Sequence, residues 1–284
     1  MNLSALDYLA AAGAAAAAGA VNALAGGGTL ISFPTLVAIG VPAVPANVTN
    51  TVALVPGYLG GAWAQRDDLR PQMERGRPLV IAAAIGGVAG SVLLVSIPSH
   101  AFRVAVPYLI LLSCGLLLFQ DRIRDRLRPP DSKGDPPASD PGRPGSEPGR
   151  PGSDPAPAGD SARDVAVHWR MALLMSVFAS AVYGGFFGAG LGIMLLAVLG
   201  LFSAEPLAKV NALKQALSFV VNLAAAIFFA FSGKVVWELV PVMAAASIVG
   251  GVAGGRLVTV IDAGVLRVLV VGIGVAVAIA FWAV

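Results

Sequence analysis

Apolar residues fall into ten runs along the chain, separated by short polar or glycine-rich stretches. The runs are Leu3–Leu24, Leu30–Ile39, Val48–Ala64, Leu79–Ile97, Ala101–Phe119, Trp169–Phe187, Leu191–Leu201, Leu207–Phe231, Val235–Val260 and Val265–Val284. Runs of about 20 residues are long enough to cross a bilayer as helices. Two shorter runs, 30–39 and 191–201, each follow a glycine-rich break, which is typical of broken or re-entrant helices. The pattern predicts an all-α integral membrane protein of about eight to ten helical segments.

The composition excludes a freely soluble globule. Only 12% of the residues are charged and 57% are apolar, whereas ordinary soluble proteins contain roughly 25% charged residues. Aromatic residues are sparse, and the sequence lacks the regular alternation of apolar and polar residues that is typical of a transmembrane barrel. The chain has one cysteine and two histidines. We therefore expect no metal site and no cofactor.

A charged, proline- and glycine-rich stretch divides the apolar runs into two groups. It contains a tandem repeat at residues 141–154 (Pro-Gly-Arg-Pro-Gly-Ser followed by Glu or Asp), which cannot bury enough apolar area to fold. We predict an N-terminal transmembrane repeat at 1–120, a disordered linker at 121–167 and a C-terminal transmembrane repeat at 168–284. Eight basic and nine acidic residues lie between positions 120 and 168. No basic stripe remains elsewhere that would indicate a nucleic-acid partner.

The two groups of runs resemble each other. Residues 85–90 (Ile-Gly-Gly-Val-Ala-Gly) match residues 249–254 (Val-Gly-Gly-Val-Ala-Gly) at an offset of 164. The glycines at 26–28 match Gly188-Ala189-Gly190 at an offset of 162. Because these matches occur in the same order, they predict two homologous repeats, which we expect to be inverted relative to each other.

The arginines predict the orientation. Arg66, Arg70, Arg75 and Arg77 follow the third run, and further arginines follow the fifth. By the positive-inside rule this face, including the linker, is cytoplasmic. If the short runs cross the membrane, each half has five segments and both termini lie outside. If the short runs only re-enter, each half has four spans and both termini lie inside.

The glycine-rich breaks are the first candidate for substrate binding. Glycine allows a ligand to approach the backbone closely, and a helix that begins after a break directs free N–H groups and a positive dipole end into the site. The candidate residues of the breaks are Gly26, Gly27, Gly28, Thr29, Gly188 and Gly190. The alternative is tight helix packing through small residues.

Lys214 is the second candidate, because a lysine so deep in an apolar run is costly unless it faces a cavity or a partner. Helical spacing places it on one face with Asn211, Gln215, Ser218 and Asn222. This polar stripe suits an anionic substrate. The alternatives are snorkelling to the membrane interface or an ion pair with Glu205, Glu238 or Asp262.

Polar residues also open the third run, where Asn47, Thr49 and Asn50 are candidate substrate ligands. Helix capping would explain Asn47 but not Asn50. No nucleotide-binding loop, zinc-protease motif or pair of membrane-buried carboxylates is present, so the sequence predicts no catalytic residues and no enzyme.

The break motifs resemble those of the sulfite exporter TauE/SafE family. They are Gly26-Gly27-Gly28-Thr29-Leu30-Ile31-Ser32-Phe33-Pro34, then Gly40-Val41-Pro42 and Ala46-Asn47-Val48-Thr49-Asn50, with Gly188-Ala189-Gly190 and Ala208-Lys209-Val210-Asn211-Ala212 in the second half. The resemblance implies a multi-pass permease of the bacterial inner (plasma) membrane, akin to 4-toluene sulfonate uptake permeases. Such a secondary carrier would export small sulfur-containing or organic anions.

We therefore expect a secondary transporter of sulfite, sulfonates or related anions, working by alternating access around the two breaks. Its partners would be a small anionic substrate and the lipid bilayer. Homo-oligomerisation and coupling to protons stay open. The alternative is a membrane-embedded scaffold or assembly factor that docks partners through the linker, and deleting the linker would abolish docking but not transport.

Overall fold

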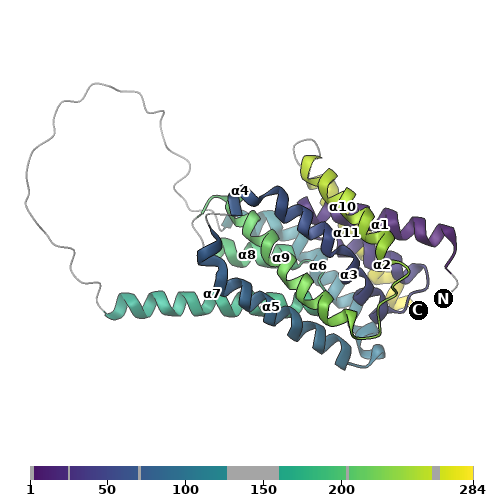
Figure 1. Cartoon of the computed structure of the whole chain (residues 1–284), viewed down its shortest axis with the longest axis horizontal. Helices are drawn as coiled ribbons and strands as arrows, with labels where there is room; N and C mark the ends of the chain where they lie inside the picture. The colour runs from purple at the N-terminus through teal and green to yellow at the C-terminus, as the bar shows by residue number, and fades with distance from the viewer. Residues whose placement is uncertain are drawn as a thin grey trace, which may run out of the picture.

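The computed structural model describes residues 3–24, 26–69, 72–126, 160–202, 205–257 and 263–283. In these ranges the chain forms helices joined by turns, without a strand, as the apolar runs predicted (Figure 1). The helices are α1 (Ala5–Leu24), α2 (Thr29–Ala38), α3 (Ala43–Ala64), α4 (Arg66–Leu69), α5 (Met73–Ser96), α6 (Ser99–Arg126), α7 (Asp160–Phe186), α8 (Leu191–Phe202), α9 (Leu207–Ala230), α10 (Val240–Leu257) and α11 (Ala263–Ala283).

Each predicted run corresponds to one helix, and within the described ranges the single-turn α4 is the one helix that no run predicted. The predicted boundaries of the linker are too wide, because α6 continues to Arg126 and α7 already begins at Asp160. The charged residues at both edges allow a helix to extend beyond its apolar segment. The tandem repeat at 141–154 lies outside the described residues.

The outer surface of the bundle is suited to lipid. Four described segments are long and apolar enough to cross a membrane, namely Gly76–Ser96, Ser99–Phe119, Val167–Phe186 and Lys209–Ala230. On α5 alone, the side chains of Ile81, Ile85 and Leu93 are exposed. Soluble proteins rarely expose such contiguous apolar surface, so this is a multi-pass membrane protein.

The helices pack in matched pairs. Helix α1 packs along α10 as α5 packs along α7, and α3 contacts α10 as α9 contacts α5. At the centre α3 packs directly against α9. The two run antiparallel, because Asn211 near the start of α9 bonds to Gln65 after the end of α3, and Thr49 near the start of α3 bonds to Val236 beyond the end of α9. Inverted repeats would produce this pattern, and the repeat itself stays a prediction.

Glycines allow the two equivalent crossings to be close. A Cβ added at Gly90 of α5 would overlap the backbone of α7 at Val182, and one added at Gly254 of α10 would overlap the backbone of α1 at Ala20. The two glycines are 164 residues apart and their partners 162 apart. The offsets found in the sequence therefore connect residues that have equivalent neighbours in the two halves. Gly90 and Gly254 therefore serve close helix packing.

Both chain termini lie at the end of the bundle opposite α4 (Figure 1). The α4 end also contains the start of α9, since the Gln72 amide donates a 3.0 Å hydrogen bond to the Lys209 carbonyl oxygen. The five-segment alternative expects the termini opposite the arginine-rich loops, and the four-span alternative expects them on the same side. The placement of the termini agrees with the five-segment alternative, and whether the short helices cross the membrane stays a prediction.

Candidate functional site

The two glycine-rich breaks contact each other inside the bundle. A Cβ on Gly26 would lie 3.0 Å from the Cα of Gly192, and one on Gly188 would lie 3.9 Å from the Thr29 hydroxyl oxygen. Gly26, Gly188 and Gly190 have φ values of 86°, 80° and 79°, a conformation that other residues rarely adopt. The half-length helices α2 and α8 therefore begin side by side.

The glycines of the first break do not leave all their N–H groups free. The Gly28 N–H donates a 2.8 Å hydrogen bond to Oδ1 of Asn22. A Cβ on Gly28 would also overlap the α1 backbone at Ala18, whereas Gly27 has only the Leu117 and Leu30 side chains nearby. The expectation of a free N–H is thus wrong at Gly28, because a side chain from α1 caps the start of α2.

A buried tyrosine that the sequence analysis missed connects this break to the centre of the bundle. The Tyr58 hydroxyl interacts with the side chains of Asn22, Thr29 and Asn222, so the group joins α1, α2, α3 and α9. Tyr58 follows Asn47 by 11 residues, the same spacing that separates Asn211 from Asn222. That spacing could have assigned Tyr58 to the polar face of α3.

The second break is held by α3 and α6. Nδ2 of Asn47 donates a 2.9 Å hydrogen bond to the Phe186 carbonyl oxygen. The Ser113 hydroxyl oxygen lies 2.9 Å from both the Tyr183 hydroxyl and the Ala189 carbonyl oxygen. The capping interpretation of Asn47 is wrong, because α3 begins four residues earlier with Pro42 as its N-cap.

Two amide oxygens on α3 stay buried without a partner. They are Oδ1 of Asn47 and Oδ1 of Asn50, and neither has a hydrogen bond within the described part of the chain. Buried polar atoms are normally paired, so an orphaned pair of acceptors calls for a bound donor, such as water or a ligand.

The polar stripe of α9 points inward, as predicted. Lys214, Gln215, Ser218 and Asn222 are all buried, and Lys214 is only 2% exposed. Its ammonium has no hydrogen bond or ion pair with a described residue. Burial on this scale excludes snorkelling, and the described carboxylates do not pair with Lys214. Asp262 lies outside the described residues.

Two of the predicted ligands lie at opposite ends of the α3–α9 pair. Nδ2 of Asn211 donates a 2.8 Å hydrogen bond to Oε1 of Gln65 near α4. Oγ1 of Thr49 accepts a 2.9 Å hydrogen bond from the Val236 N–H at the end that contains the termini. Both side chains fix helix ends. Lys214 is likewise not joined to Gly28 or Gly190 by any hydrogen bond between described residues. The predicted ligands therefore do not form one hydrogen-bonded cluster.

The surroundings of the breaks differ on their two sides. Toward α4, the α9 stripe leads from Asn222 through Ser218 to Lys214, and the Ser218 hydroxyl has no partner among the described residues. Toward the termini, rings pack edge to face: Phe33 with Phe187 at 5.4 Å and Phe102 with Phe187 at 6.3 Å between centroids. A polar path and an aromatic layer therefore meet at the breaks.

Comparison with known families identifies the chain. The profile described as "Sulfite exporter TauE/SafE" matches residues 11–281, nearly the whole length. The chain belongs to the sulfite exporter TauE/SafE family. The resemblance seen in the glycine motifs is thereby confirmed, and the TauE/SafE match spans both sides of the linker. Within the described residues there is no group of three or more His, Cys, Asp or Glu that could hold a metal ion.

Two curated relatives are similar over most of their length. A "Probable membrane transporter protein" of Haemophilus influenzae is 29% identical over 256 residues, covering 88% of this chain and 85% of the relative. A "Probable membrane transporter protein ORF9" of Sinorhizobium sp is 23% identical over 275 residues, covering 94% and 88%. No solved structure matches the chain. This TauE/SafE protein is therefore a membrane transporter.

Proposed function

We propose that this protein is a secondary transporter of small anions such as sulfite or simple sulfonates, and that the anion passes the two glycine breaks by alternating access. The main support is the buried Lys214 ammonium, which has no partner among the described residues and lies on a stripe that leads to the breaks. We place the transporter in the bacterial inner membrane, with the α4 end and the linker in the cytoplasm.

An anion would offset the cost of burying Lys214. A charged side chain within the membrane is expensive unless it faces water or an opposite charge, and a charge-assisted hydrogen bond to an oxyanion is roughly twice as strong as a neutral one. The amide of Gln215 and the hydroxyl of Ser218 lie on the same buried face and can donate further hydrogen bonds. This set favours a small oxyanion over a cation.

The breaks provide the places where the chain can bend. In this arrangement the aromatic layer of Phe33, Phe102 and Phe187 closes the terminus side of the breaks. Release to that side requires these rings to separate. The positive-φ glycines let the start of α2 or α8 turn without moving the long helices. The transport cycle would then alternate between opening of the α4 side and opening of the aromatic layer.

Transport in proteoliposomes tests this function. Lys214→Ala should lower sulfite uptake by about tenfold or more, because it removes a charge-assisted interaction, and Lys214→Arg should retain part of the uptake. Lys209→Ala is the matched control on the same helix, since its ammonium lies at the surface, 3.0 Å from the Glu205 carboxylate. Equal uptake by the wild type and Lys214→Ala would remove Lys214 from the site.

Substrate choice is tested by stabilisation. Purified protein is heated with sulfite, thiosulfate, methanesulfonate or acetate, and the transported anions should raise its melting temperature by mass action. An imposed pH gradient in the same vesicles tests for proton coupling. If no anion stabilises the protein or enters the vesicles, the anion hypothesis fails.

A further inference from the structure

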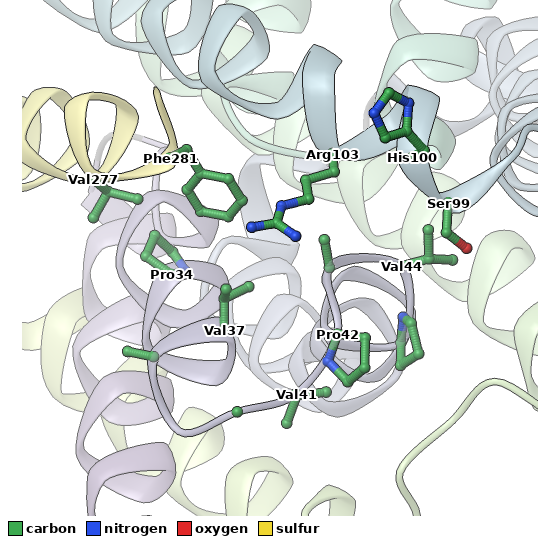
Figure 2. Close-up of a pocket in the computed structure, with 14 residues that line it drawn as sticks. Pro34, Val37, Val41, Pro42, Val44, Ser99, His100, Arg103, Val277 and Phe281 are labelled. Carbon is green, nitrogen blue, oxygen red and sulfur yellow. The ribbon is translucent and has the colours of Figure 1, made fainter. Parts of the chain in front are cut away.

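A cavity opens at the end of the bundle that contains the termini. It has a volume of about 620 Å³ and lies between the end of α2, the start of α3, the start of α6 and the end of α11 (Figure 2). Its walls are mostly apolar, including Pro34, Val37, Val44, Val277 and Phe281. A cavity of this size can hold a ligand with an apolar body of several carbon atoms.

One cation extends into this apolar space. Arg103 reaches from α6 into the space bordered by Phe281, Pro34 and Val37 (Figure 2). Among the described residues, its guanidinium has no ion pair, and no hydrogen bond to it is found. The first turn of α6, at Ser99 and His100, lines the same cavity, and its N-terminal end is electropositive. The cavity thus combines apolar walls with an unpaired guanidinium.

We infer that this cavity binds an amphiphilic anion: a carboxylate, sulfonate or phosphate head on an apolar body. Arginine binds such heads through two parallel hydrogen bonds, and the apolar walls would cover the body. An inorganic oxyanion would leave these walls without contacts. The head and body could belong to a free organic anion or to an anionic lipid, because both have the same chemistry.

The cavity is separate from the glycine breaks. Phe281 lines it and stacks on Phe33 with 6.4 Å between ring centroids, and Phe33 in turn packs edge to face on Phe187 of the second break. The aromatic layer therefore lies between this cavity and the glycine breaks. The inference goes beyond the proposed function, since binding in the cavity can be measured without transport and does not involve Lys214.

Equilibrium binding of an alkylcarboxylate series tests the inference. The probes are acetate, butyrate, hexanoate and octanoate, with the protein in a non-ionic detergent and empty micelles as the background. Each added methylene should tighten binding roughly fourfold until the cavity is filled, as expected for a buried CH₂ group. Equal affinity for acetate and octanoate, or octanoate binding no greater than that of empty micelles, would overturn the inference.

Two arginine variants test the head group. Arg103→Gln should weaken octanoate binding roughly ten- to a hundredfold, as expected for loss of a hydrogen bond to a charged group, and Arg103→Lys should restore part of it. Arg77→Gln is the control, because Arg77 is exposed as Arg103 is but lies near the opposite end of the bundle, away from the cavity. Equal octanoate affinities of Arg103→Gln and Arg77→Gln would contradict the assignment.

Octanoate binding also distinguishes a free organic anion from an anionic lipid as the natural ligand. It further tests the cavity independently of the proposed function. In nanodiscs, phosphatidylglycerol added to phosphatidylcholine should compete with octanoate if the natural ligand is an anionic lipid, and should leave octanoate binding unchanged if it is a free anion. Lys214→Ala should bind octanoate as the wild type does. Loss of binding in Lys214→Ala would show that the cavity is not an independent site.

Discussion

The glycines at the helix crossings and the glycines at the breaks have opposite requirements. Gly90 and Gly250 lie inside regular helices, where any residue could adopt the backbone conformation, but a neighbouring backbone occupies the position of a Cβ. Gly190 has ordinary van der Waals room for a Cβ, 3.5 Å from Ser113, but its φ of 79° excludes most other residues.

We expect this difference to separate the glycines needed for folding from those needed for transport. The crossings need small residues because helices in a bilayer attract one another mainly through close packing. The breaks need a conformation, because Gly26, Gly188 and Gly190 turn the chain there with a positive φ that other residues rarely adopt. Alanine substitution therefore probes space at the crossings and conformation at the breaks.

The largest effect is expected at the crossings. Gly90→Ala and Gly250→Ala should each lower the free energy of unfolding by about 3 kcal/mol, because overpacking forces the backbones of two helices apart. The measurement is thermal or SDS unfolding in detergent, followed by helical circular dichroism. Unchanged unfolding of both variants would show that the helices separate at little cost and that these crossings are not tightly packed.

A smaller loss of stability and a larger loss of transport are expected at the second break. Gly190→Ala should cost only about 1–2 kcal/mol of unfolding free energy, the penalty of the left-handed conformation, because the Cβ itself meets no clash. Sulfite uptake should fall much more than folding does, since the start of α8 would shift. If uptake and stability fall in proportion, the break has only a structural role.

The smallest effect, of opposite sign, is expected at Gly13. This glycine lies in α1, the helix that receives Gly250, but it is exposed and a Cβ there has no neighbour within 4 Å. Gly13→Ala should raise the unfolding free energy by up to about 1 kcal/mol, the difference in helix propensity. Destabilisation by Gly13→Ala would indicate a contact on this face, such as another subunit, and would weaken the distinction drawn between the glycines.

The family and the helices could be predicted because they depend on local pattern. Apolar runs of sufficient length give helices in a membrane, whose backbone groups have no other partner. The polar face of α9 followed from helical spacing, but the burial of Lys214 was decided by the structure, because the sequence left snorkelling open. Tyr58 was missed because the partners of its hydroxyl, Asn22, Thr29 and Asn222, lie on three other helices. Only the packing of these helices brings them to Tyr58.

By itself, the sequence determined the membrane class, the order of the helices, the matched glycine motifs and the TauE/SafE family, since each follows from residues close together in the chain. The tertiary structure alone decided that the two breaks touch and that Asn22 caps Gly28. It also decided that Asn211 bonds to Gln65 at one helix end and that Arg103 reaches into an apolar cavity. These contacts join residues that are distant in the chain, and only the packing of whole helices fixes which side chains meet.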